Sequence, residues 1–327
     1  MQPARGIAPR AGTSPPEADL PILSFILKRV IQAGFVLVAV TLFVSFAIRL
    51  TGDPAVMMLR ESANVTPEDL ARIREGLGLN RPFLVQYGDF IGGLLTGELG
   101  NSFFRGAIAP LISGALGATL LLALTSLAVS LLISVPLGIY AATHRGSFGD
   151  QLVRVLSLAG LSFPNFWLGI MLVLIFSVTL RWLPPSGFTG PQSLIMPAVT
   201  IGVILTSTNL RIVRTTMLDV LSSQFIMVAR AKGLSQTAVI YKHALRNSSI
   251  ALVTYLGLQF GSLMGGLVVV ELVFNWPGMG TLAIEAIAQR DYPILQTVIS
   301  ILAVLIVAVN LLVDLTYMLL DPRIRLE

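Results

Sequence analysis

The sequence predicts an all-α integral membrane protein with six transmembrane helices. The chain has 327 residues, of which 54% are hydrophobic and 12% are charged, and its mean hydropathy is +0.82. A soluble domain of this length would expose more charge, whereas helices suit a bilayer because they satisfy their own backbone hydrogen bonds. Six apolar stretches are long enough to span: about 30–50, 118–142, 152–180, 195–220, 250–274 and 294–320.

Composition and motifs argue against several other classes of protein. The net charge of +5 comes from Arg and Lys in short loops beside apolar spans, with no aromatic-interleaved basic patch, so no nucleic acid partner is expected. The chain has no cysteine, and His144 and His243 lack metal-ligand spacing, so no metal site is expected. No G-x-x-x-x-G-K-S/T loop, G-x-S-x-G elbow or H-E-x-x-H pair occurs. We therefore expect no enzyme activity and no bound cofactor in this chain.

The first span and the two tails set the expected orientation. Residues 1–24 are rich in proline, show no apolar periodicity and are predicted to form a disordered cytoplasmic tail. The first transmembrane helix is placed at 25–50, where Lys28 and Arg29 would hold its start inside. Arg and Lys of the later loops favour the same side, which places both termini in the cytoplasm, including a short tail at 321–327.

Residues 51–114 form a segment of soluble character between the first two spans. Seven acidic residues outnumber five arginines there, so a small helical segment is expected on the extracytoplasmic side. Thr66 is predicted to cap a helix that starts at Pro67, with Asp69 completing a capping box, and a second helix is expected at about 82–95. The segment is either a structural lid or a landing surface for an external partner, and the sequence leaves both interpretations open.

Residues 115–320 form the predicted transmembrane core. Gly257, Gly261 and Gly265 fall on one face of the fifth span, where another helix can approach closely. Prolines lie inside or at the ends of three spans, where each removes a backbone donor and can kink its helix: Pro136, Pro164 and Pro197.

A few polar residues in the spans are candidates for a translocation pathway or for interhelical contacts. Glu271 lies near the outer end of the fifth span, and Asn310 and Asp314 lie in the sixth. Arg211 and Arg214 lie toward the inner end of the fourth. Charges inside a membrane are functional hypotheses by default. Because each charge lies near a span end, snorkelling or pairing with another chain is the alternative explanation.

A basic loop at 221–247 separates two hydrophobic runs. Its first part predicts a helix at 224–231, which Gly233 ends. Ser235 is predicted to cap a second helix that runs to about Arg246. The loop contains no acidic residue, so it should lie on the cytoplasmic side. This pattern fits either a docking element or a solvated loop that sets topology.

Segments along the whole chain resemble those of ABC importer permeases. The sequence ARAKGLSQTAVIYKHALRN is similar to their cytoplasmic loop, and its small-residue pattern falls on Ala229, Ala231 and Gly233. Seven further segments resemble the dipeptide, oligopeptide and nickel permease branch: LGLNRPFLVQY, GELGNSF, SFPNFWLGIML, WLPPSG, VVVELVFNWPGMGTL, RDYPILQ and NLLVDLTYMLLDPRIR. The chain is therefore identified as a member of this family over about residues 25–325, which implies the type I ABC importer permease fold.

The resemblance implies the membrane-spanning subunit of an ATP-driven, binding-protein-dependent importer in the inner membrane of a prokaryote. Such a permease, surrounded by lipid, pairs with a second, similar permease and receives substrate from an extracytoplasmic binding protein. Two partner ATPase subunits bind ATP and Mg and grip the cytoplasmic loop, which then holds the coupling helix. Phe225, Val228 and Ile240 would seat this helix. The ATPase-coupling residues implied are Phe225, Val228, Ala229, Arg230, Ala231, Lys232, Gly233, Leu234 and Ser235.

Two other classes of membrane protein compete with this interpretation. An ion-gradient-driven secondary transporter predicts internal repeats and an ion-binding cluster at the midplane, and the sequence shows neither. A membrane-embedded enzyme would need paired carboxylates or a His-rich site at one depth. The resemblance favours di- or oligopeptides or a related small solute as substrate, with the binding protein setting much of the selectivity.

Overall fold

The computed structural model describes residues 20–50, 52–53, 55–56, 59, 66–76 and 78–320, with the side chains of 20–26, 314 and 317–320 left out. The rest of the tails predicted at 1–24 and 321–327 lies outside the described residues. Helix α1 (Leu20–Leu50) begins inside the first of these tails, so residues 20–24 are helical and were wrongly predicted to be disordered. Pro21 is compatible with this start because the first turn of a helix does not use its N–H groups.

Among the described residues, five helices are long and apolar enough to cross a membrane, and a bent pair of helices makes six if the pair is one span. The prediction of six spans is confirmed when this pair counts as one span. Apart from one short hairpin, the described elements are helical. The long helices are α1, α5 (Ile108–Thr143), α8 (Ile195–Leu221), α10 (Leu245–Val273) and α12 (Tyr292–Leu320).

The third predicted span, 152–180, is two helices that meet at an angle of 100°. Helix α6 (Phe148–Ser162) ends before Pro164, and α7 (Asn165–Leu172) continues into the π-helical stretch η1 (Val173–Thr179). Phe163 is extended, with φ −93° and ψ 131°, because the residue before a proline avoids the helical region. The hydroxyl of Ser162 donates to the carbonyl of Leu158 at 3.0 Å. The proline therefore breaks this span rather than only kinking it.

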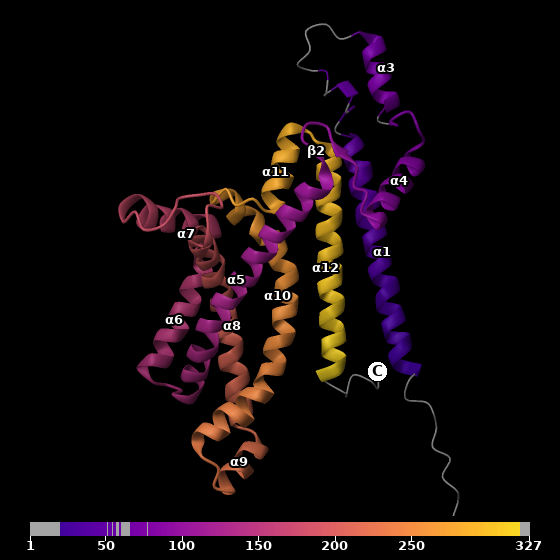
Figure 1. Cartoon of the computed structure of the whole chain (residues 1–327). Coiled ribbons are helices and arrows are strands. Elements are labelled where there is room, and N and C mark those ends of the chain that lie inside the picture. Colours follow the sequence, from indigo (N-terminus) through magenta and orange to yellow (C-terminus); the bar gives the residue numbers. More distant parts are fainter. Residues whose placement is uncertain are drawn as a thin grey trace, which may run out of the picture.

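Helices α5 and α8 form the centre of the bundle. They pack along much of their length, α10 packs against both, α6 lies on α8, α12 lies on α10, and α1 lies on α12 (Figure 1). Two glycines let α5 and α8 touch. A Cβ at Gly138 would lie 2.7 Å from Val213 Cγ1, and one at Gly202 would lie 2.8 Å from Val129 Cγ1. In lipid no hydrophobic effect drives helices together. Small residues at such crossings let the two backbones approach closely, and van der Waals packing then holds the helices together.

Residues 66–107 form a small assembly at the end of the bundle opposite α9, at the top of Figure 1. It contains α3 (Pro67–Gly76), α4 (Phe83–Thr96) and an antiparallel hairpin of β1 (Asn101–Ser102) and β2 (Gly106–Ala107), in which Asn101 pairs with Ala107. A 3₁₀ turn, η2 (Pro191–Leu194), precedes α8.

Helix α3 starts with the capping box that the sequence predicts. The Asp69 amide donates to Thr66 Oγ1 at 3.2 Å, and the Thr66 amide donates to Asp69 Oδ2 at 3.3 Å. The hydrogen bonds from the Thr66 hydroxyl and amide hold the pKa of Asp69 below its ordinary value. Helix α4 is held to α1, where the hydroxyls of Tyr87 and Thr41 lie 2.9 Å apart.

At the opposite end, α9 (Gln224–Ala231) is followed by a turn and the π-helical stretch η3 (Ala238–Ala244), which continues into α10. The second helix was predicted to stop near Arg246 before a separate span from 250, and this is wrong. The chain is helical without a break from Ala238 to Val273, and no proline occurs in this stretch.

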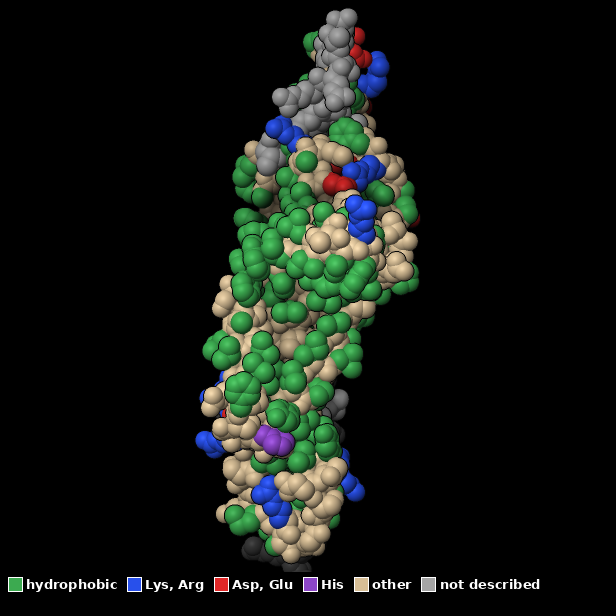
Figure 2. Space-filling view, turned by 90° about the vertical axis from the view of Figure 1, so that its left-hand side faces the viewer, with side chains coloured by type: hydrophobic (Ala, Val, Ile, Leu, Met, Phe, Trp, Pro, Cys, Tyr) green, Lys and Arg blue, Asp and Glu red, His purple; other side chains and the backbone are tan. Residues whose placement is uncertain are grey.

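The surface divides into an apolar middle and two charged ends. Figure 2 shows Lys, Arg, Asp and Glu side chains in the upper part of the molecule, Lys and Arg in the lower part, and many hydrophobic side chains between them. Large apolar side chains are exposed along this middle band, for example Phe35 at 75% and Leu132 at 76%. Such exposure is expected where lipid, not water, surrounds the helices.

Candidate functional site

Helix α9 is attached to the bundle through two apolar side chains on its inner face. Ile226 is fully buried and Ala229 is 8% exposed. Both belong to one buried cluster with Val213 and Met217 of α8 and Val239 of η3. Burial of a side chain the size of Ile stabilises by about 1.5–3 kcal/mol. These contacts attach α9 to α8 and, through η3, to α10.

The turn after α9 is a Schellman motif with Gly233 in the left-handed position. Gly233 has a φ of 78°. Its amide donates to the Arg230 carbonyl at 2.9 Å, and the Leu234 amide donates to the Ala229 carbonyl at 3.3 Å. These two bonds close the end of the helix. A Cβ at Gly233 would meet no described atom within 4 Å, so a side chain there is strained by φ and not by lack of room.

After this turn, Ser235 caps the following helix, because its hydroxyl accepts from the Ala238 amide at 3.3 Å.

The opposite face of α9 and its turn are exposed, and we refer to these residues as the α9 surface: Phe225, Val228, Arg230, Ala231, Lys232, Gly233, Leu234 and Ser235. Phe225 is 45% exposed and Val228 is 53% exposed, beside the cations of Arg230 and Lys232. Ala229, which the resemblance placed in this set, faces the chain's own core instead. Sequence reasoning missed Ile226 as its inner anchor, although the two residues lie three apart on one helical face.

Glu271 is fully buried near the end of α10, where it makes contacts between helices of the same chain. Its carboxylate accepts from the Thr119 hydroxyl of α5 at 2.6 Å and from the amides of Gly280 and Thr281 at 2.7 and 3.1 Å. These amides belong to the first turn of α11 (Met279–Gln289), where a carboxylate satisfies donors that have no partner inside the helix. Glu271 is therefore the N-terminal cap of α11, supplied by another helix.

Two more hydrogen bonds tie α11 and its preceding turn to α5. Thr119 Oγ1 accepts from the Met279 amide at 2.8 Å, and the Trp276 indole donates to the Ala118 carbonyl at 2.9 Å. Together with the Glu271 bonds, we call this set the outer clasp. A Cβ at Gly278 would lie 2.1 Å from Glu271 Oε1, so the carboxylate requires glycine there. The sequence WPGMG, which served above only for the family resemblance, also marks this turn.

Two other buried carboxylates also join elements that are distant in the sequence. Asp150 at the start of α6 is 1% exposed and pairs with Arg214 of α8, with N–O distances of 2.7 and 2.9 Å. Asp291 accepts from the Ser102 hydroxyl of β1 and, at 3.5 Å, from the Ile294 amide of α12. Arg214 is therefore an internal partner, and sequence reasoning missed both acids.

The other residues that the sequence singled out are three glycines of α10, two polar residues of α12 and Arg211 of α8. A Cβ at Gly257 would lie 2.0 Å from Val313 Cγ2, and one at Gly261 would lie 3.3 Å from Asn310 Oδ1, whereas Gly265 has no described atom within 4 Å. Gly265 therefore does not join this contact within the chain. Asn310 is exposed on α12, as is Arg211 on α8. The side chain of Asp314 lies outside the described residues.

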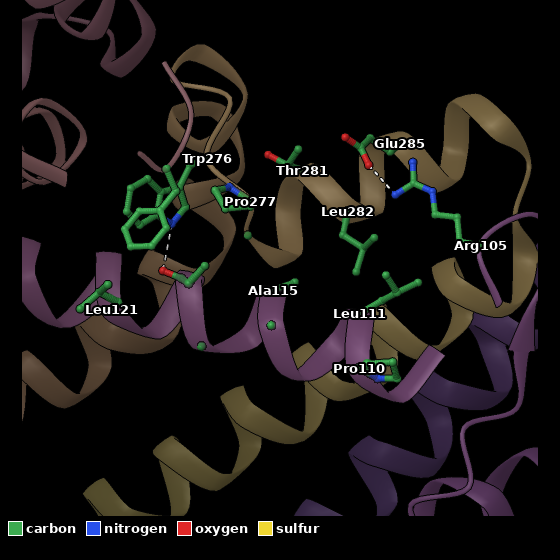
Figure 3. A pocket seen from close by; sticks show the side chains of 15 residues that line it. Arg105, Pro110, Leu111, Ala115, Leu121, Trp276, Pro277, Thr281, Leu282 and Glu285 are labelled. Carbon is green, nitrogen blue, oxygen red and sulfur yellow. Dashed lines mark hydrogen bonds and ion pairs between the residues drawn. The ribbon is translucent and has the colours of Figure 1, made fainter. Parts of the chain in front are cut away.

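A cavity of about 580 Å³ lies between α5 and α11, beside the outer clasp. Figure 3 shows α5 along one side and α11 along the other, with Trp276 toward one end and Arg105 and Glu285 at the other. Arg105 Nη1 and Glu285 Oε2 form an ion pair of 2.7 Å at this end. The walls are mainly apolar, and sequence reasoning identified none of these residues as a site.

The apolar bundle and the exposed short helix at one end fit the membrane-spanning subunit of a transporter, and the sequence comparisons identify the family. The chain belongs to the family of binding-protein-dependent transport system inner membrane components, whose model matches residues 134–326. The model of the N-terminal part of the same systems' membrane components matches residues 22–116. The chain is thus a permease subunit of a binding-protein-dependent ABC importer, and the alternative of an ion-gradient-driven secondary transporter is excluded.

Relatives of known name agree with this family. The glutathione transport system permease protein GsiC of Salmonella typhimurium is 39% identical over 307 residues, which cover 93% of this chain and 99% of the relative. A probable peptide ABC transporter permease protein of Sinorhizobium fredii, y4tP, is 39% identical over 311 residues, or 92% and 99% of the two chains. These matches support a permease of the peptide type.

Among solved structures, a chain of the MetNI methionine ABC transporter in an inward-facing conformation has a similar fold. The TM-score is 0.54 at 18% sequence identity, over 64% of this chain and 96% of that chain. At this identity the similarity shows the fold alone, which is that of an ABC importer permease.

Proposed function

We propose that this chain carries peptides or related small solutes across the inner membrane, and that the α9 surface receives the force of ATP hydrolysis from partner ATPase subunits. The observation that carries the proposal is the two-sided construction of α9. Its inner face is buried against α8 and η3, and its outer face exposes apolar side chains beside two cations. A helix that is attached to the bundle on one side and exposed to a partner on the other can transmit a displacement of that partner to the bundle.

The electrostatics of the α9 surface support an ATPase partner. Arg230 and Lys232 are exposed, and no acidic residue lies between Asp219 and Glu271. Acidic or carbonyl groups on a partner would meet these cations, while Phe225 and Val228 would enter an apolar depression. ATP and Mg would bind to that partner and not to this chain.

The orientation follows from the same charges. Basic loops favour the cytoplasm, so the α9 end is assigned to the cytoplasmic side, with both termini there as well. The assembly at 66–107 then lies outside, where it is positioned to meet a substrate-binding protein. We infer from the family that a second permease of similar fold completes the path.

The proposed substrate class rests on the relatives. GsiC is named for glutathione and y4tP for peptides, and both match this chain over nearly its whole length. A short peptide or a peptide-like conjugate is therefore the substrate class to test first.

The test of coupling replaces Gly233 with Trp in the assembled transporter reconstituted in proteoliposomes. We expect the variant to insert and assemble, while stimulation of ATPase activity by substrate-loaded binding protein falls to the basal level, because the Trp side chain would project from the α9 surface into the partner. Stimulation equal to that of the wild type would contradict the proposal.

Gly146→Trp is the matched control. Gly146 also has a positive φ, 82°, and also has no described atom within 4 Å of a Cβ, but it lies in the turn between α5 and α6. The control variant carries the same backbone strain and should keep normal stimulation.

A further inference from the structure

Helix α4 lies beside the C-terminal half of α1 and not beyond its end (Figure 1). Its first residue, Phe83, packs edge to face on Phe46, with ring centroids 6.2 Å apart. One turn later the Tyr87 hydroxyl lies 2.9 Å from Thr41 Oγ1 and donates to the Val38 carbonyl at 3.4 Å. The contacts on α1 therefore move away from its end as the chain passes along α4.

These contacts lie at the depth of the membrane that α1 crosses. The apolar part of α1 that is long enough to span is Leu27–Leu50. Thr41 precedes the end of this span by nine residues, or about 14 Å of helix at about 1.5 Å per residue. Because a hydrocarbon layer is about 30 Å thick, the Tyr87 hydroxyl reaches nearly to its middle.

Helices α4 and α3 differ in composition although they belong to the same small assembly. Neither helix has a buried residue. Five of the ten residues of α3 are charged, whereas Asp89 is the one charged residue among the fourteen of α4. Leu84 and Leu95 of α4 are 71% and 83% exposed. Each Å² of apolar surface left in water is unfavourable by about 25 cal/mol, and acyl chains would cover it.

The polar side chains of α4 lie on the side opposite these leucines. Leu84 and Leu95 share one face because the eleven residues between their positions make about three turns. Gln86 and Asp89 line a cavity of about 460 Å³ between α4, α1 and α12. Gln86 Oε1 accepts from Arg49 Nη2 at 2.6 Å, and the Asp89 carboxylate pairs with an arginine just before the helix. A helix on the surface of a water-soluble protein turns its apolar face inward, whereas α4 turns it outward.

We propose that α4 is embedded in the outer leaflet of the membrane, with Leu84 and Leu95 against lipid acyl chains. The side named outer follows from the orientation proposed above, whereas the insertion does not depend on it. Helix α4 lies at acyl-chain depth on α1, its exposed face is apolar, and its polar side chains are paired on the other face. Protein interfaces are enriched in aromatic and arginine side chains, and this face offers aliphatic ones instead.

Arg49 marks the level at which α4 enters the leaflet. Its guanidinium lies 4.5 Å from the centroid of the Phe83 ring, at the start of α4, and arginines near the ends of spans lie at the membrane interface. The segment at 51–114, predicted to be extracytoplasmic and of soluble character, then includes one helix in lipid, while α3 with its charged surface remains in water. This segment is therefore divided between lipid and water.

The test measures the environment of labels on α4 in the complete transporter, reconstituted in liposomes. The chain has no cysteine, so single cysteines can carry a nitroxide spin label, with the unsubstituted transporter as the background for labels on partner subunits. Collisions are measured with oxygen, which concentrates in lipid, and with a nickel chelate, which stays in water. Labels at Leu84→Cys and Leu95→Cys should give an oxygen-to-nickel collision ratio severalfold above that of Arg72→Cys on α3, whose side chain is 79% exposed. The ratio should match that of Leu132→Cys on α5, exposed at 76%.

Two results would overturn the insertion of α4 into lipid. Nickel collision rates on α4 equal to that of Arg72→Cys would place the helix in water. Labels shielded from both reagents would mean that protein, such as the second permease, covers this face.

A measurement on the unsubstituted transporter does not depend on any cysteine variant. A phospholipid that carries a photoreactive diazirine in its acyl chain is mixed into the liposomes and irradiated, and the labelled peptides are identified by mass spectrometry. Peptides of α1 and α4 should be labelled, and peptides of α3 should not. Labelling of α1 without labelling of α4 would contradict the insertion.

Discussion

The two ends of the bundle are held together by different chemistry. At the α11 end, the outer clasp fixes a helix through a buried carboxylate, a buried indole and backbone amides. At the α9 end, the short helix is seated by apolar side chains and closed by a turn at Gly233. Hydrogen bonds in a low dielectric are directional, whereas apolar contacts depend on how closely the side chains pack. The α11 end is therefore held by polar bonds of defined geometry, and the α9 end by close apolar packing.

The largest expected effect comes from breaking the outer clasp with Glu271→Ala. The change leaves two amides and the Thr119 hydroxyl without an acceptor in a buried place, at about 1–3 kcal/mol for each group. We expect a loss on the order of 3 kcal/mol or more, read as a marked fall in the thermal midpoint of the purified transporter.

Glu285→Ala is the control for this change, because it removes another carboxylate from the same region but one that is 43% exposed. Its loss should be below about 1 kcal/mol. Equal midpoints for the two variants would mean that the clasp does not hold α11.

The next largest effect on stability is expected from the buried contacts that attach α9 to the bundle, which we call its seat. Ile226→Ala removes a fully buried side chain and should cost about 2–3 kcal/mol, in the range of such truncations in cores. The adjacent Met227 is 67% exposed, so Met227→Ala should leave the midpoint unchanged. Limited proteolysis at the α9 end should be faster for Ile226→Ala alone, and equal rates would contradict the proposed seat.

The contrast between the ends also explains what the sequence could predict. Helix α9 was predicted at 224–231 and is found there, and the capping box of α3 is present, because caps, glycine turns and apolar spacing act over a few residues. The outer clasp was not predicted, since Thr119 and Glu271 meet from residues far apart in the chain. The Asp150–Arg214 pair was not predicted for the same reason. Only the position of Asp150 at the start of a helix had a local signal, since Ser147 is the N-cap and accepts from the Asp150 amide at 3.2 Å.

Two predictions of helix geometry, the kink at Pro164 and the helix end near Arg246, differ from the structure. Pro164 was recognised as a possible kink, but the sequence does not say how far a broken span turns, and the angle of 100° depends on what each half packs against. Within a few residues of Arg246, where a helix end was predicted, the sequence changes from polar to apolar. That change moves a helix from water to lipid without ending it, because the backbone hydrogen bonds continue through both.

Substitution of Gly233 should lower the stability by a smaller amount than the changes above. Gly233→Ala places a Cβ at a φ of 78°, which costs about 1–2 kcal/mol, although no described atom crowds it. Gly266→Ala, inside α10 with equal room, should instead stabilise by about 0.5–1 kcal/mol. Thermal midpoints that move in opposite directions would support the left-handed turn, and a shift in the same direction would count against it.

The smallest expected effect on stability is the most informative about function. Phe225 and Val228 are 45% and 53% exposed, so the double change to Ala should move the thermal midpoint by less than about 0.5 kcal/mol. If these side chains enter a depression on an ATPase subunit, the same change should weaken that subunit's binding by about 2 kcal/mol or more, since buried apolar anchors dominate interfaces. Co-purification of the ATPase and its stimulation by loaded binding protein measure this directly.

Phe35→Ala on α1, which removes an apolar side chain exposed at 75% away from the α9 end, should change neither quantity. A double variant that retains the ATPase at wild-type level would mean that exposure at α9 reflects solvent alone, and the difference between the two ends would then concern stability and not the transfer of force.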